Sequence, residues 1–209
     1  MPDSATAGGN VYDKYGTANP IEQRLVGGFI ERLLELAGRT GATDVHEVGC
    51  GEGELAQRLA ARGMRVRGTD AAPRAIVEAR DRAKAAGLEI DFRAAALEEL
   101  DPASDAAELV VCCEVLEHLP DPDAALAMVA RLAQPWAVVS VPREPLWRAL
   151  NVARLKYVRD LGNTPGHLNH WTRRSFLRFL ATRLEVVEVR SPLPWTMALC
   201  RSTSKIPPS

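Results

Sequence analysis

The chain has 209 residues, and its 26 lysines and arginines nearly balance its 27 aspartates and glutamates, for a formal net charge of −1. This length suits one domain around a single core. The balanced charge, without a block of five or more like charges, argues against a broad basic surface for nucleic acid or an anionic membrane. With no C-x-x-C pair and no 18-residue apolar run, we expect a cytoplasmic protein without membrane insertion.

Short apolar runs alternate with helical periodicity along the chain. Helices, recognised by apolar residues at three- and four-residue steps or by proline starts, are predicted at 20–37, 54–63, 73–87, 121–134 and 172–183. Strands are predicted at 44–49, 65–70, 88–93, 108–113, 137–141, 184–190 and 195–201. This alternation implies right-handed crossovers and a parallel sheet.

The last two predicted strands break the alternation. Only residues 191–194 join them, too short a link for a parallel crossover, so they should pair antiparallel. We predict an α/β, Rossmann-like doubly wound fold with a mostly parallel seven-stranded sheet, an antiparallel last strand and helices on both faces. One domain would cover 11–200, with a lid at 143–171, between a disordered N-terminus (1–10) and a flexible tail (201–209).

A glycine loop, Glu47-Val48-Gly49-Cys50-Gly51-Glu52-Gly53, ends the first predicted strand. Glycines between a strand and a helix let a ligand approach the backbone, and the helix N-terminus offers unpaired N–H groups to an anion. The dinucleotide fingerprint G-x-G-x-x-G is not met, because Glu54 occupies its last position. Asp70 closes the next strand, about 20 residues on, where an acidic side chain can bind ribose hydroxyls. These residues predict a site for a nucleotide-like ligand.

The spacing E-x-G-x-G-x-G followed by Asp70 resembles that of the class I S-adenosylmethionine (SAM)-dependent methyltransferases, and the order of elements from 43 to 200 is similar throughout. The resemblance implies SAM as cofactor, with Gly49 and Gly51 beside its methionine part and Asp70 on its ribose hydroxyls. Glu47 would order the loop or assist the ammonium group. The other cofactor-binding residues that it implies are Tyr15, Cys50, Ala71, Ala96, Leu97 and Cys113.

An acidic stretch, Glu114-Val115-Leu116-Glu117-His118, follows the apolar run at 108–113. It emerges at the carboxyl edge of the predicted sheet, where open α/β folds bind ligands. If 114–118 form a helical turn, Glu114, Glu117 and His118 share one face. Two carboxylates and an imidazole suit Mg²⁺, Mn²⁺ or Zn²⁺. The residues leave three uses open, as metal ligands, as acid/base groups in an acceptor pocket, or as packing residues.

The pattern E-V-L-E-H, combined with H-x-x-x-W-T at 167–172, resembles two subgroups: ubiquinone-biosynthesis O-methyltransferases and small-RNA 3′-terminal 2′-O-methyltransferases. The RNA enzymes hold a divalent ion with two glutamates and two histidines. The resemblance therefore implies a metal site made of Glu114, Glu117, His118 and His167. His170 stands where the RNA enzymes tend to have glutamate, and no basic run is present, so we do not expect a nucleic-acid substrate.

Methyl transfer from a sulfonium mainly requires that the acceptor be aligned with the methyl carbon and the sulfur. A hydroxyl acceptor must also lose a proton, and the candidate catalytic residues are His118, His167, His170 and Glu114. We expect O-methylation of a small hydroxylated molecule in an acceptor pocket beneath the 143–171 lid. The alternatives are N-methylation of a small amine or peptide, RNA 2′-O-methylation, and a catalytically idle partner protein that binds the cofactor. The sequence indicates no oligomeric state.

Overall fold

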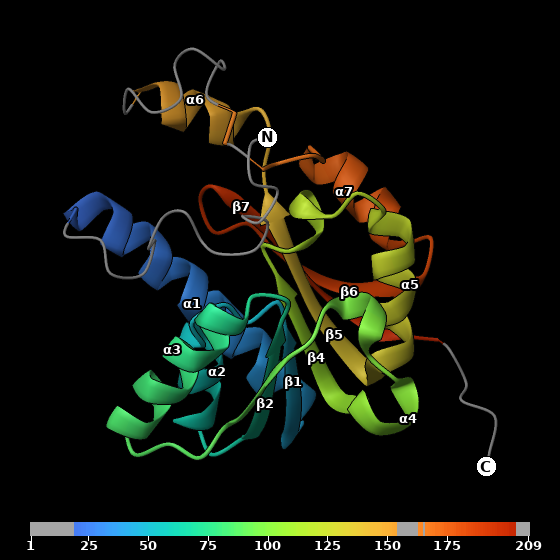
Figure 1. Ribbon diagram of the computed structural model, residues 1–209. Helices are drawn as coiled ribbons and strands as arrows, with labels where there is room; N and C mark the ends of the chain where they lie inside the picture. Colours follow the sequence, from blue (N-terminus) through green and yellow to red (C-terminus); the bar gives the residue numbers. More distant parts are fainter. Residues whose placement is uncertain (1–18, 154–162, 165, 204–209) are drawn as a thin grey trace, which may run out of the picture.

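The computed structural model describes residues 19–153, 163–164 and 166–203 (Figure 1). A seven-stranded sheet lies at its centre, with the strand order β3-β2-β1-β4-β5-β7-β6. The last strand, β7, runs antiparallel to both of its neighbours. The predicted fold class is therefore confirmed. The predicted disordered N-terminus, Tyr15 and most of the predicted tail lie outside the described residues.

The sheet and its helices follow the predicted alternation. The strands are β1 (Asp44–Val48), β2 (Arg65–Asp70), β3 (Asp91–Ala94), β4 (Ala107–Cys113), β5 (Ala133–Pro142), β6 (Leu184–Arg190) and β7 (Trp195–Ser202). The helices are α1 (Pro20–Thr40), α2 (Glu54–Ala60), α3 (Pro73–Ala85), α4 (Pro102–Asp105), α5 (Pro122–Leu132), α6 (Leu146–Ala153) and α7 (Arg173–Leu180). Two 3-10 turns, η1 (Leu97–Glu99) and η2 (Leu116–His118), complete the described elements.

Helices cover both faces of the sheet (Figure 1). On one face, Phe29 and Leu33 of α1 pack with residues of α2 and α3. On the other, Leu126 of α5 packs with Phe176 and Leu180 of α7. Central strands covered on both sides read as continuous apolar runs, as those in β4 and β5 do. The two cores thus lie between the sheet and the helices on its faces. α6 lies beyond the carboxyl ends of the parallel strands (Figure 1).

Several boundaries differ from the prediction, and at three strand ends the difference follows from strand pairing. β5 begins at Ala133, ahead of the predicted 137, because Ala133 pairs with Ala107. β3 begins at Asp91, later than the predicted 88, where its pairing with β2 starts. β7 continues through Ser202, whose hydroxyl donates to Ala130 O at 2.6 Å. The folded region therefore extends past the predicted boundary at 200.

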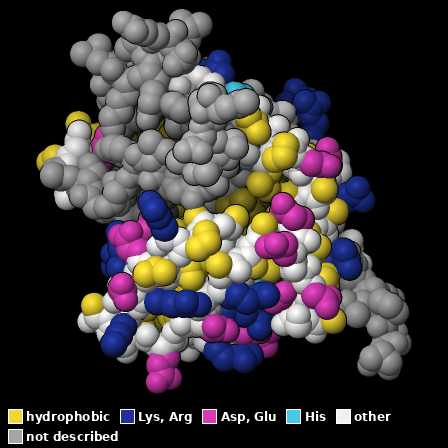
Figure 2. Space-filling model, in the orientation of Figure 1, with side chains coloured by type: hydrophobic (Ala, Val, Ile, Leu, Met, Phe, Trp, Pro, Cys, Tyr) yellow, Lys and Arg dark blue, Asp and Glu magenta, His cyan; other side chains and the backbone are white. Residues whose placement is uncertain are grey.

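The surface carries mixed charge. On the face displayed in Figure 2, acidic and basic side chains are intermixed over its lower half, in keeping with the net charge of −1. In the described ranges, no helix has the length and apolar character needed to cross a membrane.

Candidate active site

The glycine loop between β1 and α2 has a backbone that favours glycine. Gly49, Gly51 and Gly53 have φ angles of 71°, 52° and 77°, which side chains other than glycine rarely accept. The Gly49 N–H donates to Thr69 O at 2.7 Å, which ties the loop to the end of β2. A Cβ added at Gly49 would lie 2.3 Å from Val115 Cγ2. The loop backbone therefore packs directly against the segment that follows β4.

Asp70 supports the other side of this loop. Its Oδ2 accepts the Gly51 N–H at 2.9 Å, and its Oδ1 accepts the Ala72 N–H at 2.8 Å. Each carboxylate oxygen keeps a second lone pair, so the group can still accept hydrogen bonds from two vicinal hydroxyls. The Asp70 carbonyl accepts the Ala95 N–H at 3.0 Å, which places residues 96–97 beside it. The structure thus gathers these predicted cofactor residues at one edge.

Other predicted cofactor residues form the floor of this edge. Glu47 lies one residue before the end of β1, and Cys113 ends β4. They are 3% and 8% exposed. Burial raises the pKa of the Cys50 and Cys113 thiols well above the ordinary value, so both stay protonated at neutral pH. Neither thiol is therefore suited to act as a nucleophile. Ala71 is exposed directly after β2.

His46, one residue before Glu47, supports the loop from beneath. It is fully buried, with Nδ1 2.8 Å from Asp105 O and Nε2 3.0 Å from Thr69 Oγ1. A carbonyl only accepts, so the Nδ1–H donates to Asp105 O and the Thr69 hydroxyl donates to Nε2. Burial lowers the pKa of His46, and the hydrogen bond to Asp105 partly opposes that shift. His46 is therefore a neutral structural residue.

On the opposite side of the edge, Glu117, His118 and His167 form a compact group. One atom from each side chain that could bind a metal ion lies within 4.8 Å of the other two. The two imidazole rings meet edge to face, with their centroids 4.8 Å apart. Glu117 is 1% exposed. His118 Nδ1 lies 3.0 Å from Gly166 O, so the proton is assigned to Nδ1 and the lone pair to Nε2. The fold therefore brings His118 and His167 into contact although they are far apart in the sequence.

Asn169 explains how His167 reaches this group. The Asn169 N–H donates to Glu117 O at 3.0 Å, and Asn169 Nδ2 donates to Leu116 O and Leu119 O at 3.1 and 2.6 Å. These bonds hold the segment 166–171 on η2. No local sequence signal marks Asn169 as a site residue, because its side-chain partners lie 53 and 50 residues away along the chain.

Glu114 lies outside the group of three. Its φ of 61° makes it the one non-glycine residue with positive φ in the part of the chain that the structure describes. The helical turn therefore begins at Leu116. Because residues 114–118 do not form one helical turn, the condition for a face shared by Glu114, Glu117 and His118 is not met. Glu114 Oε2 instead accepts the Trp195 Nε1–H at 2.6 Å, while Ser140 Oγ lies 3.4 Å from Oε1.

His170 is also separate from the group. It is exposed, with Nε2 2.7 Å from Asn163 Oδ1 and 3.1 Å from Arg148 Nη2. Its contacts thus join α6 to the segment before α7. Of the four predicted catalytic residues, the structure brings only His118 and His167 together.

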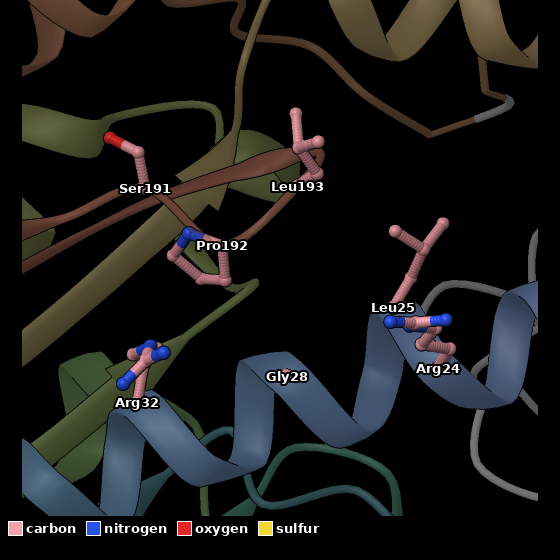
Figure 3. A pocket seen from close by; sticks show the side chains of 7 residues that line it. All are labelled: Arg24, Leu25, Gly28, Arg32, Ser191, Pro192 and Leu193. Carbon is pink, nitrogen blue, oxygen red and sulfur yellow. The ribbon is translucent and has the colours of Figure 1, made fainter.

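A cavity of about 410 Å³ opens between α1 and the β6–β7 turn (Figure 3). Arg24 and Arg32 lie on its α1 side, and residues 191–193 form the other wall. This turn leads into Trp195, which pairs with Pro142 at the end of β5. The cavity therefore adjoins the carboxyl edge, although its lining contains none of the predicted site residues.

The fold and the glycine loop together define a Rossmann-like methyltransferase, and comparison with known proteins agrees. Residues 45–136 match the family described as "Methyltransferase domain". Over 91% of both chains, the structure resembles the magnesium protoporphyrin IX methyltransferase of Synechocystis PCC 6803 with bound SAH, with a TM-score of 0.68 and 20% identity. That degree of identity supports the fold alone.

Curated relatives place the chain more closely. It is 34% identical over 191 residues to a ubiquinone biosynthesis O-methyltransferase of Paracidovorax citrulli, covering 85% of this chain and 78% of the relative. Its 37% identity to the Chromobacterium violaceum protein of the same name extends over 108 residues, 51% of this chain and 45% of the relative. In several such matches the chain spans about half the relative's length, from 44% to 56%. The chain belongs to the class I SAM-dependent methyltransferases.

Proposed function

We propose that the chain transfers the methyl group of SAM to a hydroxyl oxygen of a small acceptor. The observation that carries this proposal is the group Glu117, His118 and His167, whose turn packs against the glycine loop through Val115. A hydroxyl is a poor nucleophile until its proton is removed, and two imidazoles beside the methyl donor supply that function. The relatives named O-methyltransferases also favour oxygen over nitrogen as the acceptor atom.

The geometry supports a direct displacement. SAM would lie along the edge formed by Glu47, Gly49, Gly51 and Asp70, with its sulfonium methyl directed toward residues 114–118. The acceptor oxygen attacks the methyl carbon as the carbon–sulfur bond breaks, which forms a methyl ether and S-adenosylhomocysteine (SAH). His118 Nε2 would receive the hydroxyl proton, because the Nδ1–H is held by Gly166 O. His167, held against it, would orient the acceptor.

As an alternative to the proton-acceptor role of His118, a divalent cation fits the same three groups, because a nitrogen that coordinates a metal cannot also take up a proton. One carboxylate and two imidazoles are ligands that Zn²⁺ and Mn²⁺ accept, and Mg²⁺ would take more of its ligands from water. The His118 Nδ1–H bond to a backbone carbonyl is the orienting contact that metal-bound histidines usually make. When bound, the cation would lower the pKa of the acceptor hydroxyl. Glu114, the fourth predicted ligand, is not part of this set, and its Oε2 accepts a hydrogen bond from Trp195.

Surface charge and the state of the cysteines support the proposed kind of acceptor and the proposed compartment. The mixed surface charge favours a small molecule over nucleic acid as acceptor. All four cysteines are buried thiols without a disulfide, which supports a reducing compartment such as the cytoplasm. The α6 segment and residues 163–171 would cover the acceptor.

The cofactor assignment is tested by calorimetric binding of SAM. In Asp70→Ala, the loop loses the acceptor for the Gly51 N–H and SAM loses its ribose partner. We expect affinity to fall by about 100-fold, or about 2.7 kcal/mol, since hydrogen bonds to charged groups contribute about 1.5 to 3 kcal/mol each. Asp81→Ala, which removes an exposed carboxylate from α3, should bind like the wild type. Equal affinity of all three proteins would overturn the assignment.

The acceptor assignment is tested by SAH release with panels of phenols, catechols and small amines. We expect turnover with hydroxylated acceptors, and a loss of about 100-fold in kcat for His118→Ala, since general base catalysis typically contributes about that factor. His167→Ala should lose activity because the acceptor is no longer oriented. Both variants should keep the SAM affinity of the wild type. Turnover with amines alone would contradict the proposal. SAM binding without turnover on any acceptor would favour the idle partner instead.

The metal is tested by measuring turnover with and without a chelator. Activity that survives chelation would remove the metal from the mechanism.

A further inference from the structure

We infer that Trp195 is a positioning residue that fixes the Glu114 carboxylate at the edge of the acceptor site. This inference rests on the proposed function. The Trp195 Nε1–H donates to Glu114 Oε2 at 2.6 Å, and Trp195 is 4% exposed. A hydrogen bond between an N–H and a carboxylate is shorter and stronger than one between neutral groups, and burial shields it from competing water. The indole therefore sets the direction in which the Glu114 carboxylate points.

The backbone at Glu114 gives a second reason. Its φ of 61° is a conformation that a residue with a Cβ rarely adopts. Such a conformation persists only where the surroundings hold it, and it concentrates at functional sites. Here the Glu114 N–H donates to Ser140 O at 3.1 Å, and the side chain is held by Trp195 and approached by Ser140 Oγ. These contacts hold the carboxylate against β5 and β7.

Aromatic packing fixes the orientation of the Trp195 indole and so keeps its N–H directed at Glu114. The Trp195 ring lies 5.0 Å from the Phe29 ring and 5.8 Å from the Trp147 ring, both in tilted contact. Trp147 in turn stacks at 6.0 Å on the ring of His167, and its Nε1–H donates to Thr164 Oγ1 at 2.8 Å. One row of rings thus connects α1, β7 and α6 to the histidine group.

Because Trp195 holds Glu114 and Trp147 stacks on His167, this row of rings fixes the position of Glu114 relative to His167. Its carboxylate keeps further lone pairs, which can accept a hydrogen bond from a hydroxyl of the acceptor. Trp195 acts through Glu114 in this arrangement, since the structure places the indole between the core and that carboxylate. Removing the N–H while keeping an aromatic ring should release the carboxylate without emptying the core.

The contact itself is tested by NMR, without any turnover. The four tryptophans give four indole N–H signals in the ¹⁵N-labelled protein, and Trp195→Phe identifies the one from Trp195. We expect that signal to lie downfield of the others and to move upfield in Glu114→Ala, while the other three stay in place. A Trp195 signal that is unchanged by Glu114→Ala would overturn the inference, whether or not methylation is observed.

The functional consequence is tested by a double-mutant cycle on kcat/KM for the acceptor. Trp195→Phe should lower kcat/KM about tenfold and leave SAM affinity unchanged, and it should have no further effect in a Glu114→Ala background. Equal losses in both backgrounds, or no loss in the first, would overturn the inference. Trp136→Phe, at the opposite end of the β5–β7 pair, is the matched control and should behave like the wild type. Absence of turnover in the wild type would count against the proposed function, leaving the NMR result to decide the contact.

Discussion

The two sides of the candidate site are built in different ways. On the cofactor side, the functional groups come from residues 47–70, and they are held mainly by backbone bonds such as Gly49 N–H to Thr69 O. On the acceptor side, residues 114–118 meet partners from 163–171 and from β7 through side chains, among them Asn169 and Trp195. A local backbone cradle therefore faces a set of long-range side-chain contacts.

This difference determines what each side tolerates. The glycine loop is destabilised by any side-chain atom added to its glycines, but it depends on few particular side chains. The acceptor side needs particular donors and acceptors, because each contact joins segments that are distant in the chain. Substitutions on the cofactor side should therefore impair folding and SAM binding together, whereas those on the acceptor side should impair turnover and spare SAM binding.

Gly49→Ala should give the largest loss of stability. The added Cβ would sit 2.3 Å from Val115 Cγ2, and φ would remain at 71°. Strain from the positive φ costs about 1 kcal/mol or more, and overpacking adds about 1 to 3 kcal/mol. We expect the free energy of unfolding in urea to fall by about 2 to 4 kcal/mol, with weaker SAM binding.

Gly63→Ala separates these two causes. Gly63 has a φ of 84° and open space around its Cα, so alanine there suffers the strain alone and should cost about 1 kcal/mol. Adding Val115→Ala to Gly49→Ala should restore part of the lost stability. Equal losses for the two glycine variants would mean that the contact between the loop and Val115 is not tight.

The fold and the cofactor side could be predicted from sequence because their determinants are local. Apolar periodicity and proline starts located the helices, and E-x-G-x-G-x-G with Asp70 located the loop. Asp70 and Gly51 do meet, at 2.9 Å. Strand ends were less accurate, as at Ala133, because pairing with a neighbouring strand sets them.

The acceptor side was predicted only in part for the opposite reason. Glu117 and His118 are neighbours in a turn, and the structure brings His167 to them as expected. Glu114 was misplaced because helical spacing was assumed where the chain takes a positive φ, and no local residue type announces that turn at a glutamate. Its partner Trp195 comes from β7, beyond the reach of any pattern within 114–118.

Asn169→Ala tests the acceptor side, with a smaller effect. It removes both hydrogen bonds from Asn169 Nδ2 to η2 and its flank, each contributing about 0.5 to 1.5 kcal/mol. We expect kcat/KM for the acceptor to fall about tenfold because His167 is held less firmly, while calorimetric SAM affinity stays unchanged. Leu168→Ala removes an exposed neighbouring side chain and serves as the control. A parallel loss of SAM affinity would contradict the division between the two sides.

His46 should give the smallest effect, and one that depends on pH. Burial, together with the charges of Arg67 and Arg93, lowers the pKa of folded His46, whereas the unfolded chain keeps a value of about 6.5. As the pH falls below 6.5, the unfolded state binds more protons than the folded state. Stability from this residue is therefore full above pH 6.5 and is lost toward the lower, folded pKa, by at most about 1.4 kcal/mol per pH unit. We therefore expect His46→Gln to show a shallower pH dependence than the wild type in urea unfolding between pH 5 and 6.5. Equal slopes for the two proteins would mean that His46 is not held neutral beneath the glycine loop.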